Sequence, residues 1–380
     1  MPTASGPVGK IRVIPLYKPH IPEEAATAVH GVLQSGQISG DGRLPDLEER
    51  LRQFLGAPHI AVTAEFSRTL EMALRLAGVG PGDSVLLSPL ACLASTMPLL
   101  QVGATPVWAD IDPTTGSLDA DEIRRKHSPK VKAVLLYHWV GVPADVDAAL
   151  NVTRELGLRV IEDAGEALGA EYGAKRIGSH GFDYSVFSFS PVRHITTGEG
   201  GAIACRDRDQ DALARTYRRY GIPDTGFRDD LGEISPACDI TVTGTHNYMN
   251  RMAGALGILQ MDRLPQILAR HRSNGQFFDE RLADVPGIRL LNRDKQRIAS
   301  FWVYCFRCER RDDLLRVLRE ARIYASRVHI RNDRYTCFGT GVADLPRVEE
   351  FERTQLCIPT GWWVTDEDRE YIVDTIRKGW

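Results

Sequence analysis

The sequence predicts an α/β protein, with a large domain on a mostly parallel sheet and a smaller C-terminal α/β domain. Short, nearly continuous apolar runs alternate with helical segments through the first two-thirds of the 380 residues. This alternation is typical of a parallel sheet covered by helices on both faces. After a long amphipathic segment at residues 249–283, strand and helix patterns alternate with a different rhythm. A chain of this length can form one large domain and one smaller domain.

The elements of the large domain follow from local patterns. Apolar runs rich in β-branched residues predict strands at residues 60–63, 84–87, 105–108, 131–136, 158–161, 184–189 and 202–204. Helical spacing of apolar residues predicts helices at residues 44–55, 69–77, 119–126 and 145–156. Capping residues agree, because Gly78 follows the second of these helices and Asp145 begins the fourth.

The C-terminal part is expected to contain strands at residues 288–291 and 300–306 and helices at 311–321 and 366–377. We therefore place the large domain at residues 15–265 and the small domain at 266–380, and expect the N-terminal tail to pack on the small domain. Cys305 and Cys308 have CxxC spacing, but no second CxxC and no histidine pair lie nearby. Such thiols are expected in the core of a strand and not at a metal site.

Composition restricts the possible partners. The formal net charge of −3 gives no electrostatic reason to expect nucleic acid or an anionic membrane as a partner. No apolar run approaches the roughly 18 residues that cross a bilayer. Residues 1–10 lack the apolar segment of a secretory signal. The sequence therefore predicts a cytoplasmic protein that acts on small molecules.

Residues 187–201 carry the most specific motif: Phe-Ser-Phe-Ser-Pro-Val-Arg-His-Ile-Thr-Thr-Gly-Glu-Gly-Gly. This segment resembles the lysine loop of the DegT/StrS family of sugar aminotransferases, which are pyridoxal-phosphate (PLP) enzymes of fold type I. Further similar fragments lie at residues 35–40, 80–85, 109–112 and 161–164, and the resemblance extends over about residues 15–378. It implies an aspartate-aminotransferase-like fold of type I and a homodimer.

Arg193 occupies the position of the lysine that forms the Schiff base in the family. A guanidinium group has a pKa above about 12 and stays protonated, so it is neither an amine nucleophile nor a ready general base. The resemblance therefore implies a protein that is not an ordinary transaminase.

The resemblance also assigns positions for PLP or its amine form, pyridoxamine phosphate. Asp163 matches the carboxylate that pairs with the pyridine nitrogen, and Ser188 matches a serine that contacts the phosphate. Ser67 lies in the phosphate loop, and Cys92 stands where an aromatic residue stacks on the ring. Asn247, or His246 if the register shifts by one residue, matches a contact to the partner subunit's site.

Several positions depart from the family pattern. The phosphate loop reads Glu65-Phe66-Ser67 before Arg68, which brings in a negative charge and removes the close backbone approach that glycine permits. Glu166 replaces a neutral residue and would face the phenolate oxygen of the cofactor. The family therefore implies PLP or pyridoxamine phosphate as the cofactor, whereas the residues present at these positions oppose its binding.

Three functions remain open. In the first, the pocket is repurposed for a small polar substrate, either sugar-like or an amino compound. Catalysis would then use Asp163, Glu166, Arg193 and His194, and binding would use Glu65, Arg68 and His246. Alternatively, the protein is a lysine-independent pyridoxamine-phosphate enzyme of the sugar-dehydratase type, with His194 as the base. In the third interpretation, Arg193 fills a dead site by pairing with Glu166 or Asp163, and the chain is a subunit that pairs with an active paralogue.

Overall fold

The computed structural model describes residues 12–40, 42, 44–292, 294–339 and 341–380. Its centre is a seven-stranded sheet in the order β1-β9-β8-β5-β4-β2-β3. The strands are β1 (Ile60–Thr63), β2 (Ser84–Leu87), β3 (Thr105–Trp108), β4 (Val131–Tyr137), β5 (Arg159–Asp163), β8 (Tyr184–Ser188) and β9 (Gly201–Cys205). Neighbours from β3 to β8 pair in parallel, and only β9 pairs antiparallel, with β1 and β8. The predicted mostly parallel sheet is confirmed.

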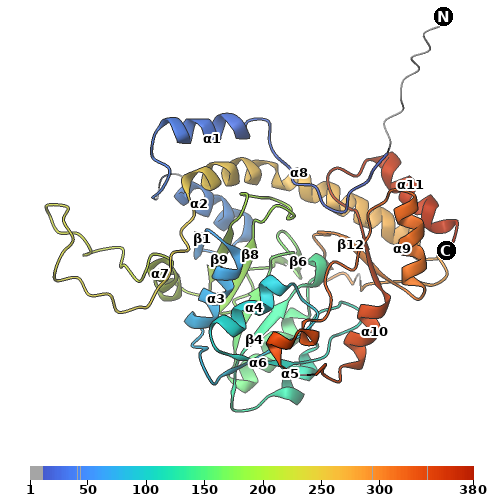
Figure 1. Ribbon diagram of the computed structural model, residues 1–380, viewed down its shortest axis with the longest axis horizontal. Coiled ribbons are helices and arrows are strands. Elements are labelled where there is room, and N and C mark those ends of the chain that lie inside the picture. The colour runs from blue at the N-terminus through green and yellow to red at the C-terminus, as the bar shows by residue number, and fades with distance from the viewer. Residues whose placement is uncertain (1–11, 41, 43, 293, 340) are drawn as a thin grey trace, which may run out of the picture.

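Helices cover both faces of this sheet (Figure 1). They are α2 (Leu44–Leu55), α3 (Phe66–Leu76), α4 (Leu93–Gln101), α5 (Ala120–Lys126), α6 (Val146–Leu156) and α7 (Arg208–Tyr217). In α2, the residues at helical spacing (Leu44, Leu47, Leu51 and Leu55) are all buried, because one apolar stripe faces the sheet. β1, β2, β8 and β9 are buried along their whole length, which explains their continuous apolar character. The edge strand β3 is only partly buried.

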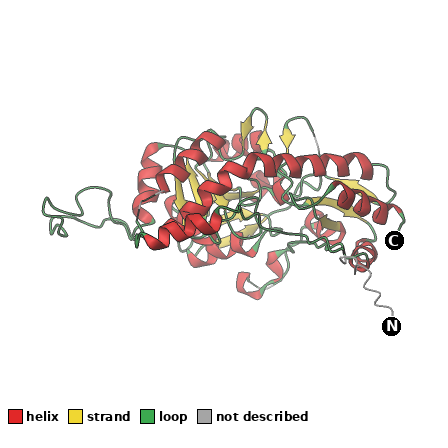
Figure 2. Cartoon of the chain, turned by 90° about the horizontal axis from the view of Figure 1, so that it is seen from above, coloured by secondary structure: helices red, strands yellow, loops and turns green. Residues whose placement is uncertain are grey.

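A second, three-stranded antiparallel sheet forms the C-terminal part, in the order β10-β12-β13. Its strands are β10 (Ile288–Leu290), β12 (Tyr304–Cys308) and β13 (Gln355–Ile358), and its helices are α9 (Arg311–Glu320), α10 (Pro346–Thr354) and α11 (Asp366–Arg377). Cys305 and Cys308 lie buried on β12. The long helix α8 (Arg251–Leu282) runs from the large sheet toward the small one (Figures 1 and 2). The domain boundary that we predict near residue 265 therefore falls inside a continuous helix and stays a prediction.

The N-terminal segment reaches the small sheet. Ile14 forms a bridge with Ile323, and Leu16 is buried among residues of the small domain. Residues 1–10, in which we expect no secretory signal, lie outside the described residues. Within the described chain, no helix has the length and apolar character that a membrane crossing requires.

Two features differ from the local predictions. The strand expected from residue 300 begins only at Tyr304, because Phe301 has a left-handed backbone (φ 50°) and the chain bends there. The bend turns Trp302 toward the large domain. In addition, the sequence patterns did not predict α1 (Ala25–Gln34), α4, α7, α10 or β13. They also did not predict the short strands β6 (Glu171–Tyr172), β7 (Lys175–Arg176) and β11 (Arg297–Ile298).

Candidate functional site

The candidate site lies where parallel strands of the large sheet end. β4 ends at Tyr137 and β5 at Asp163, and Glu166 follows in the next turn. The loop between β8 and β9 carries Arg193 to the same edge. Because the carboxyl ends of parallel strands meet at one edge of a sheet, these side chains gather there.

Glu166 is the centre of a buried charge cluster. Its Oε1 accepts hydrogen bonds from Arg193 Nη1 at 3.1 Å and from His329 Nε2 at 2.8 Å, and its Oε2 accepts one from the Val140 N–H at 3.0 Å. Burial opposes ionisation of Glu166, but the charges of His329 and Arg193 outweigh it and hold its pKa below the usual value. The carboxylate is therefore ionised and fully engaged.

Arg193 is held on its other side by aromatic rings. Its guanidinium carbon lies 4.3 Å from the ring centre of Trp302, a cation–π contact. Trp302 in turn stacks on Tyr17, with ring centres 5.1 Å apart, and on His329 at 6.1 Å. Only 7% of the Arg193 side chain is exposed. Arg193 is thus a paired and packed cation.

Asp163 lies beside this cluster without an ion pair of its own. Its Oδ1 accepts the Gly165 N–H at 3.0 Å, while Oδ2 has no hydrogen-bond partner within the described chain. Burial raises the pKa of Asp163 to about 6, although a nearby Ser95 and the Gly165 N–H act in the opposite direction. Asp163 and Glu166 are therefore neighbouring carboxyls with opposite pKa shifts.

His194 points away from the carboxyl cluster. Its Nε2 lies 3.0 Å from the carbonyl oxygen of Ser300, and its ring centre is 4.8 Å from that of His271. Burial, together with His271, moves the pKa of His194 well below its usual value. The ring is neutral and 2% exposed. It is packed between the loop and α8.

The N-terminus of α3, where the phosphate loop of the resemblance would lie, is capped by its own chain. Glu65 is the N-cap residue, and its carboxylate accepts the N–H groups of Ser67 at 2.8 Å and Arg68 at 2.7 Å. Asn247, 1% exposed, fixes the backbone at this point by accepting the Ala64 and Glu65 N–H groups through Oδ1. An anion at a helix N-terminus is stabilised by free N–H groups and by the helix dipole. Here a side-chain carboxylate takes that place.

Phe66 fills the adjoining space. Its side chain is buried, and a Cβ placed on Gly165 would lie 3.0 Å from the Phe66 ring and 3.1 Å from Asp163 Oδ1. The phenyl ring and the carboxylate of Asp163 therefore converge on Gly165.

Burial, with a smaller effect from the Glu65 charge, also raises the pKa of Glu199, which places a second carboxyl near the helix end.

The remaining predicted residues lie at the margins of the site. Ser188 ends β8, with its Oγ 3.3 Å from that of Ser190. Cys92 precedes α4, and burial raises the pKa of its thiol. Arg68 turns back along α3 to pair with Glu71 at 3.2 Å, and His246 pairs with Arg219 in a β-bridge outside the cluster.

Three residues of the cluster were not predicted from the sequence. Tyr17, Trp302 and His329 come from the N-terminal segment and the small domain, more than 100 residues from Arg193 in the chain. No local pattern marks them, because their contribution depends on how the two sheets pack.

Comparisons with known proteins agree with this geometry. A sequence model described as the DegT/DnrJ/EryC1/StrS aminotransferase family matches residues 19–377. The spore coat polysaccharide biosynthesis protein SpsC of Bacillus subtilis (strain 168) is 28% identical over 376 residues, which are 96% of each chain. The sugar aminotransferase CalS13 from Micromonospora echinospora is 31% identical, with a TM-score of 0.92 over 97% of this chain and 100% of that one. AtS13 from Actinomadura melliaura is 33% identical, with a TM-score of 0.92 over 97% and 99%. The expected aminotransferase-like fold of type I is confirmed.

Proposed function

The chain belongs to the DegT/DnrJ/EryC1/StrS aminotransferase family, and on that premise we propose that it is a non-catalytic subunit in sugar-related biosynthesis. The pathway would make a specialised metabolite or a polysaccharide, as the names of SpsC and CalS13 suggest for those relatives. The observation that carries the proposal is the buried ion pair of Arg193 with Glu166. A guanidinium in that state offers neither a free electron pair nor a proton acceptor.

The family depends on PLP, and the residues present do not fit it. A phosphate needs the N–H groups at the start of α3, but the carboxylate of Glu65 already accepts two of them. The cofactor ring needs the space before Asp163, into which Phe66 packs beside Gly165. Glu166 adds a negative charge where the family has a neutral group. We therefore derive no chemistry through this cofactor.

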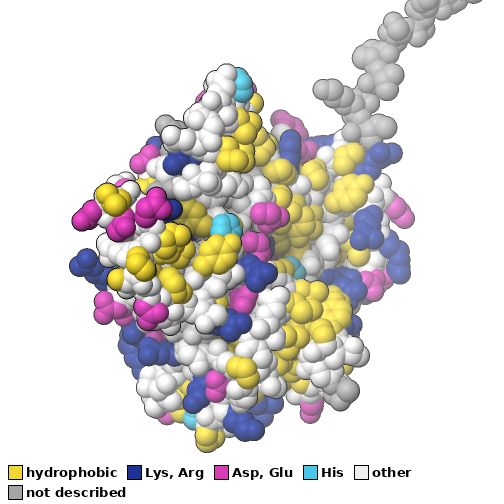
Figure 3. Space-filling view, turned by 60° about the vertical axis from the view of Figure 1, so that its left-hand side comes forward, with side chains coloured by type: hydrophobic (Ala, Val, Ile, Leu, Met, Phe, Trp, Pro, Cys, Tyr) yellow, Lys and Arg dark blue, Asp and Glu magenta, His cyan; other side chains and the backbone are white. Residues whose placement is uncertain are grey.

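An exposed segment of the chain supports the role of a subunit. Between α7 and α8 the chain leaves the body of the protein as a long loop (Figures 1 and 2), and it carries the exposed side chains Leu231 (88%) and Ile234 (62%). Figure 3 shows further hydrophobic side chains on that face, among charged ones. Exposed apolar groups on a projecting segment are typical of contact with another chain. In this proposal the partner is a lysine-bearing paralogue, and a homodimer is the alternative.

The test has two parts. The purified chain, mixed with PLP and dialysed, should retain no cofactor absorbance, whereas a lysine-bearing family member treated in the same way should retain it. Co-expression with the lysine-bearing member of the same pathway should then give a complex with more activity than the paralogue alone. Stoichiometric cofactor retention or turnover by this chain alone would overturn the proposal.

A second candidate function rests on the opposite pKa shifts of Asp163 and Glu166. Two neighbouring carboxyls whose pKa values are shifted in opposite directions are a typical acid–base arrangement, and Asp163 Oδ2 has no hydrogen-bond partner within the described residues. In this alternative, the pocket acts on a small polar substrate. A nucleotide sugar that stabilises the parent chain and not Asp163→Asn would favour it. Lysine-independent chemistry with His194 as base has less support, because that ring contacts Ser300 and His271 instead of the carboxyls.

A further inference from the structure

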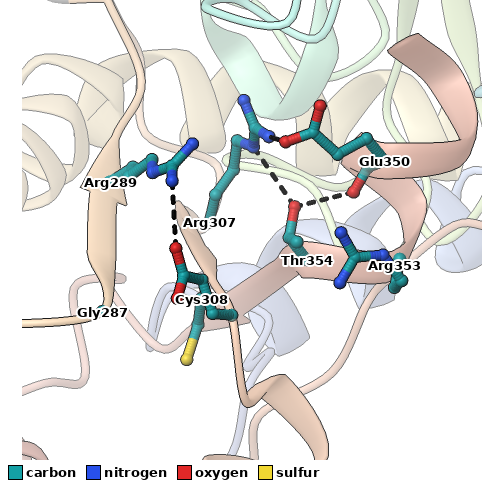
Figure 4. Close-up of a pocket in the computed structure, with 8 residues that line it drawn as sticks. Gly287, Arg289, Arg307, Cys308, Glu350, Arg353 and Thr354 are labelled. Carbon is teal, nitrogen blue, oxygen red and sulfur yellow. Dashed lines mark hydrogen bonds and ion pairs between the residues drawn. The ribbon is translucent and has the colours of Figure 1, made fainter. Parts of the chain in front are cut away.

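A shallow pocket of about 200 Å³ lies on the small domain, and none of its residues belongs to the Arg193 cluster. Three arginines from three elements line it: Arg289 from β10, Arg307 from β12 and Arg353 from α10 (Figure 4). Two glutamates, Glu309 and Glu350, also line it. Three positive and two negative side chains leave one formal positive charge in this small space.

Two of the arginines are placed at an energetic disadvantage. Arg289 and Arg307 are direct cross-strand partners in the antiparallel pair of β10 and β12. Like charges opposite each other destabilise a sheet. Each is paired with a glutamate, Arg289 with Glu309 at 3.0 Å and Arg307 with Glu350. The first pair is about 60% exposed on both sides, so it contributes little and a competing anion can replace it.

Arg307 is oriented before any ligand arrives. Its side chain is 12% exposed, its Nε donates to Thr354 Oγ1 at 3.2 Å, and its Nη2 pairs with Glu350. Thr354 is itself fixed through a 2.8 Å bond to the Glu350 carbonyl oxygen. The Nη1 of Arg307 has no hydrogen-bond partner in the described part of the chain. The side chain of Arg353 makes neither a hydrogen bond nor an ion pair there.

From this arrangement we propose that the pocket binds the phosphate group of a small molecule. Guanidinium groups present planar, forked donors that match phosphate oxygens. Arg353 and the free Nη1 of Arg307 supply donors without breaking a contact, and Arg289 joins them when the phosphate displaces Glu309. The proposal does not depend on whether the family's site is active.

The test is a titration of the full chain with inorganic phosphate, at an ionic strength held constant with chloride. The parent should bind one phosphate with saturation, and acetate should bind more weakly. Arg353→Gln removes a charged donor and should weaken binding by about tenfold or more. Glu309→Gln removes the competing anion and should tighten binding, which a misfolded variant would not do.

Arg316→Gln on α9 is the matched control. This arginine is 70% exposed and, among the described residues, pairs only with Asp313, so its loss should leave phosphate affinity unchanged. The proposal is overturned by non-saturable phosphate binding, by equal affinity in the parent and Arg353→Gln, or by tighter binding of acetate than of phosphate.

Discussion

Replacing Arg193 tests whether its buried pair with Glu166 is a structural centre of the protein. We choose Arg193→Met, because methionine keeps much of the side-chain volume and removes only the charge and the donors. The variant loses the 3.1 Å ion pair with Glu166 and the contact with the Trp302 ring at 4.3 Å. Glu166 keeps its bonds to His329 and to the Val140 N–H.

The expected loss follows from these contacts. A hydrogen bond to a charged group contributes about 1.5–3 kcal/mol, and a desolvated cation–π contact about 0.5–2 kcal/mol. Since Glu166 retains two donors, the loss should stay at or below the roughly 3–5 kcal/mol that follows when a buried ion pair is broken. We expect about 2–4 kcal/mol. At roughly 1–2 °C per kcal/mol in a chain of this size, the melting temperature should fall by about 2–8 °C.

The assay is thermal unfolding of the parent, Arg193→Met, Glu166→Gln and the double variant. The double variant should recover half or more of the loss, because no lone charge remains buried. Arg316→Met, at an exposed arginine on α9, should melt like the parent. If Arg193→Met also melts within a degree of the parent, or if the double variant is as unstable as the single one, the cluster is not the structural centre that we describe.

Three further predictions concern the neighbouring residues. Arg193→Lys should not restore cofactor binding, measured by absorbance after dialysis against PLP, because Glu65 and Phe66 still occupy the site. Glu65→Ala should lower stability by about 0.5–2 kcal/mol through loss of the N-cap, whereas Glu280→Ala on the exposed side of α8 should have little effect in the same denaturant titration. Asp163 has a folded pKa of about 6 against 3.8 when unfolded, so its burial lowers stability as pH rises from about 4 to 6. Asp163→Asn should therefore stabilise the chain by about 2–3 kcal/mol at pH 8 and lose this advantage below about pH 4; equal gains at both pH values would contradict the shift.

Local sequence patterns were sufficient for most of the fold. The strands at residues 60–63, 84–87 and 105–108 and the helix at 44–55 match the structure residue for residue, because apolar runs and helical spacing are properties of a segment and its nearest layer. The strand expected at 300–306 was wrong in its first four residues. There the backbone of Phe301 bends so that Trp302 can reach the large domain, and such a tertiary contact leaves no periodic signal.

The sequence named some of the residues that the structure brings together at the candidate site, and less of their arrangement. The resemblance placed Arg193, Glu166 and Asp163 together, and the ends of parallel strands bring them there. It could not give the direction of Glu65. The sequence suggested a charge that repels phosphate, whereas the structure shows an N-cap that accepts two N–H groups. The backbone at Glu65 decides between these alternatives, and residue 247, far along the chain, fixes that backbone.

In the cofactor-free subunit that we propose, three side chains of the site reinforce one another energetically. Without a phosphate, the N–H groups at the start of α3 would remain unsatisfied, and the Glu65 carboxylate satisfies two of them. Without a cofactor ring, the space before Gly165 would be a cavity, and Phe66 fills it. Without the cofactor's charges, a buried lysine would lack a partner, and Arg193 with Glu166 forms a closed pair. Each of these three side chains stabilises the chain only when the cofactor is absent. Replacing one of them would therefore leave the other two still opposed to cofactor binding. Under the proposed function, this coupling would account for a chain without cofactor chemistry whose fold still superimposes on the sugar aminotransferase CalS13.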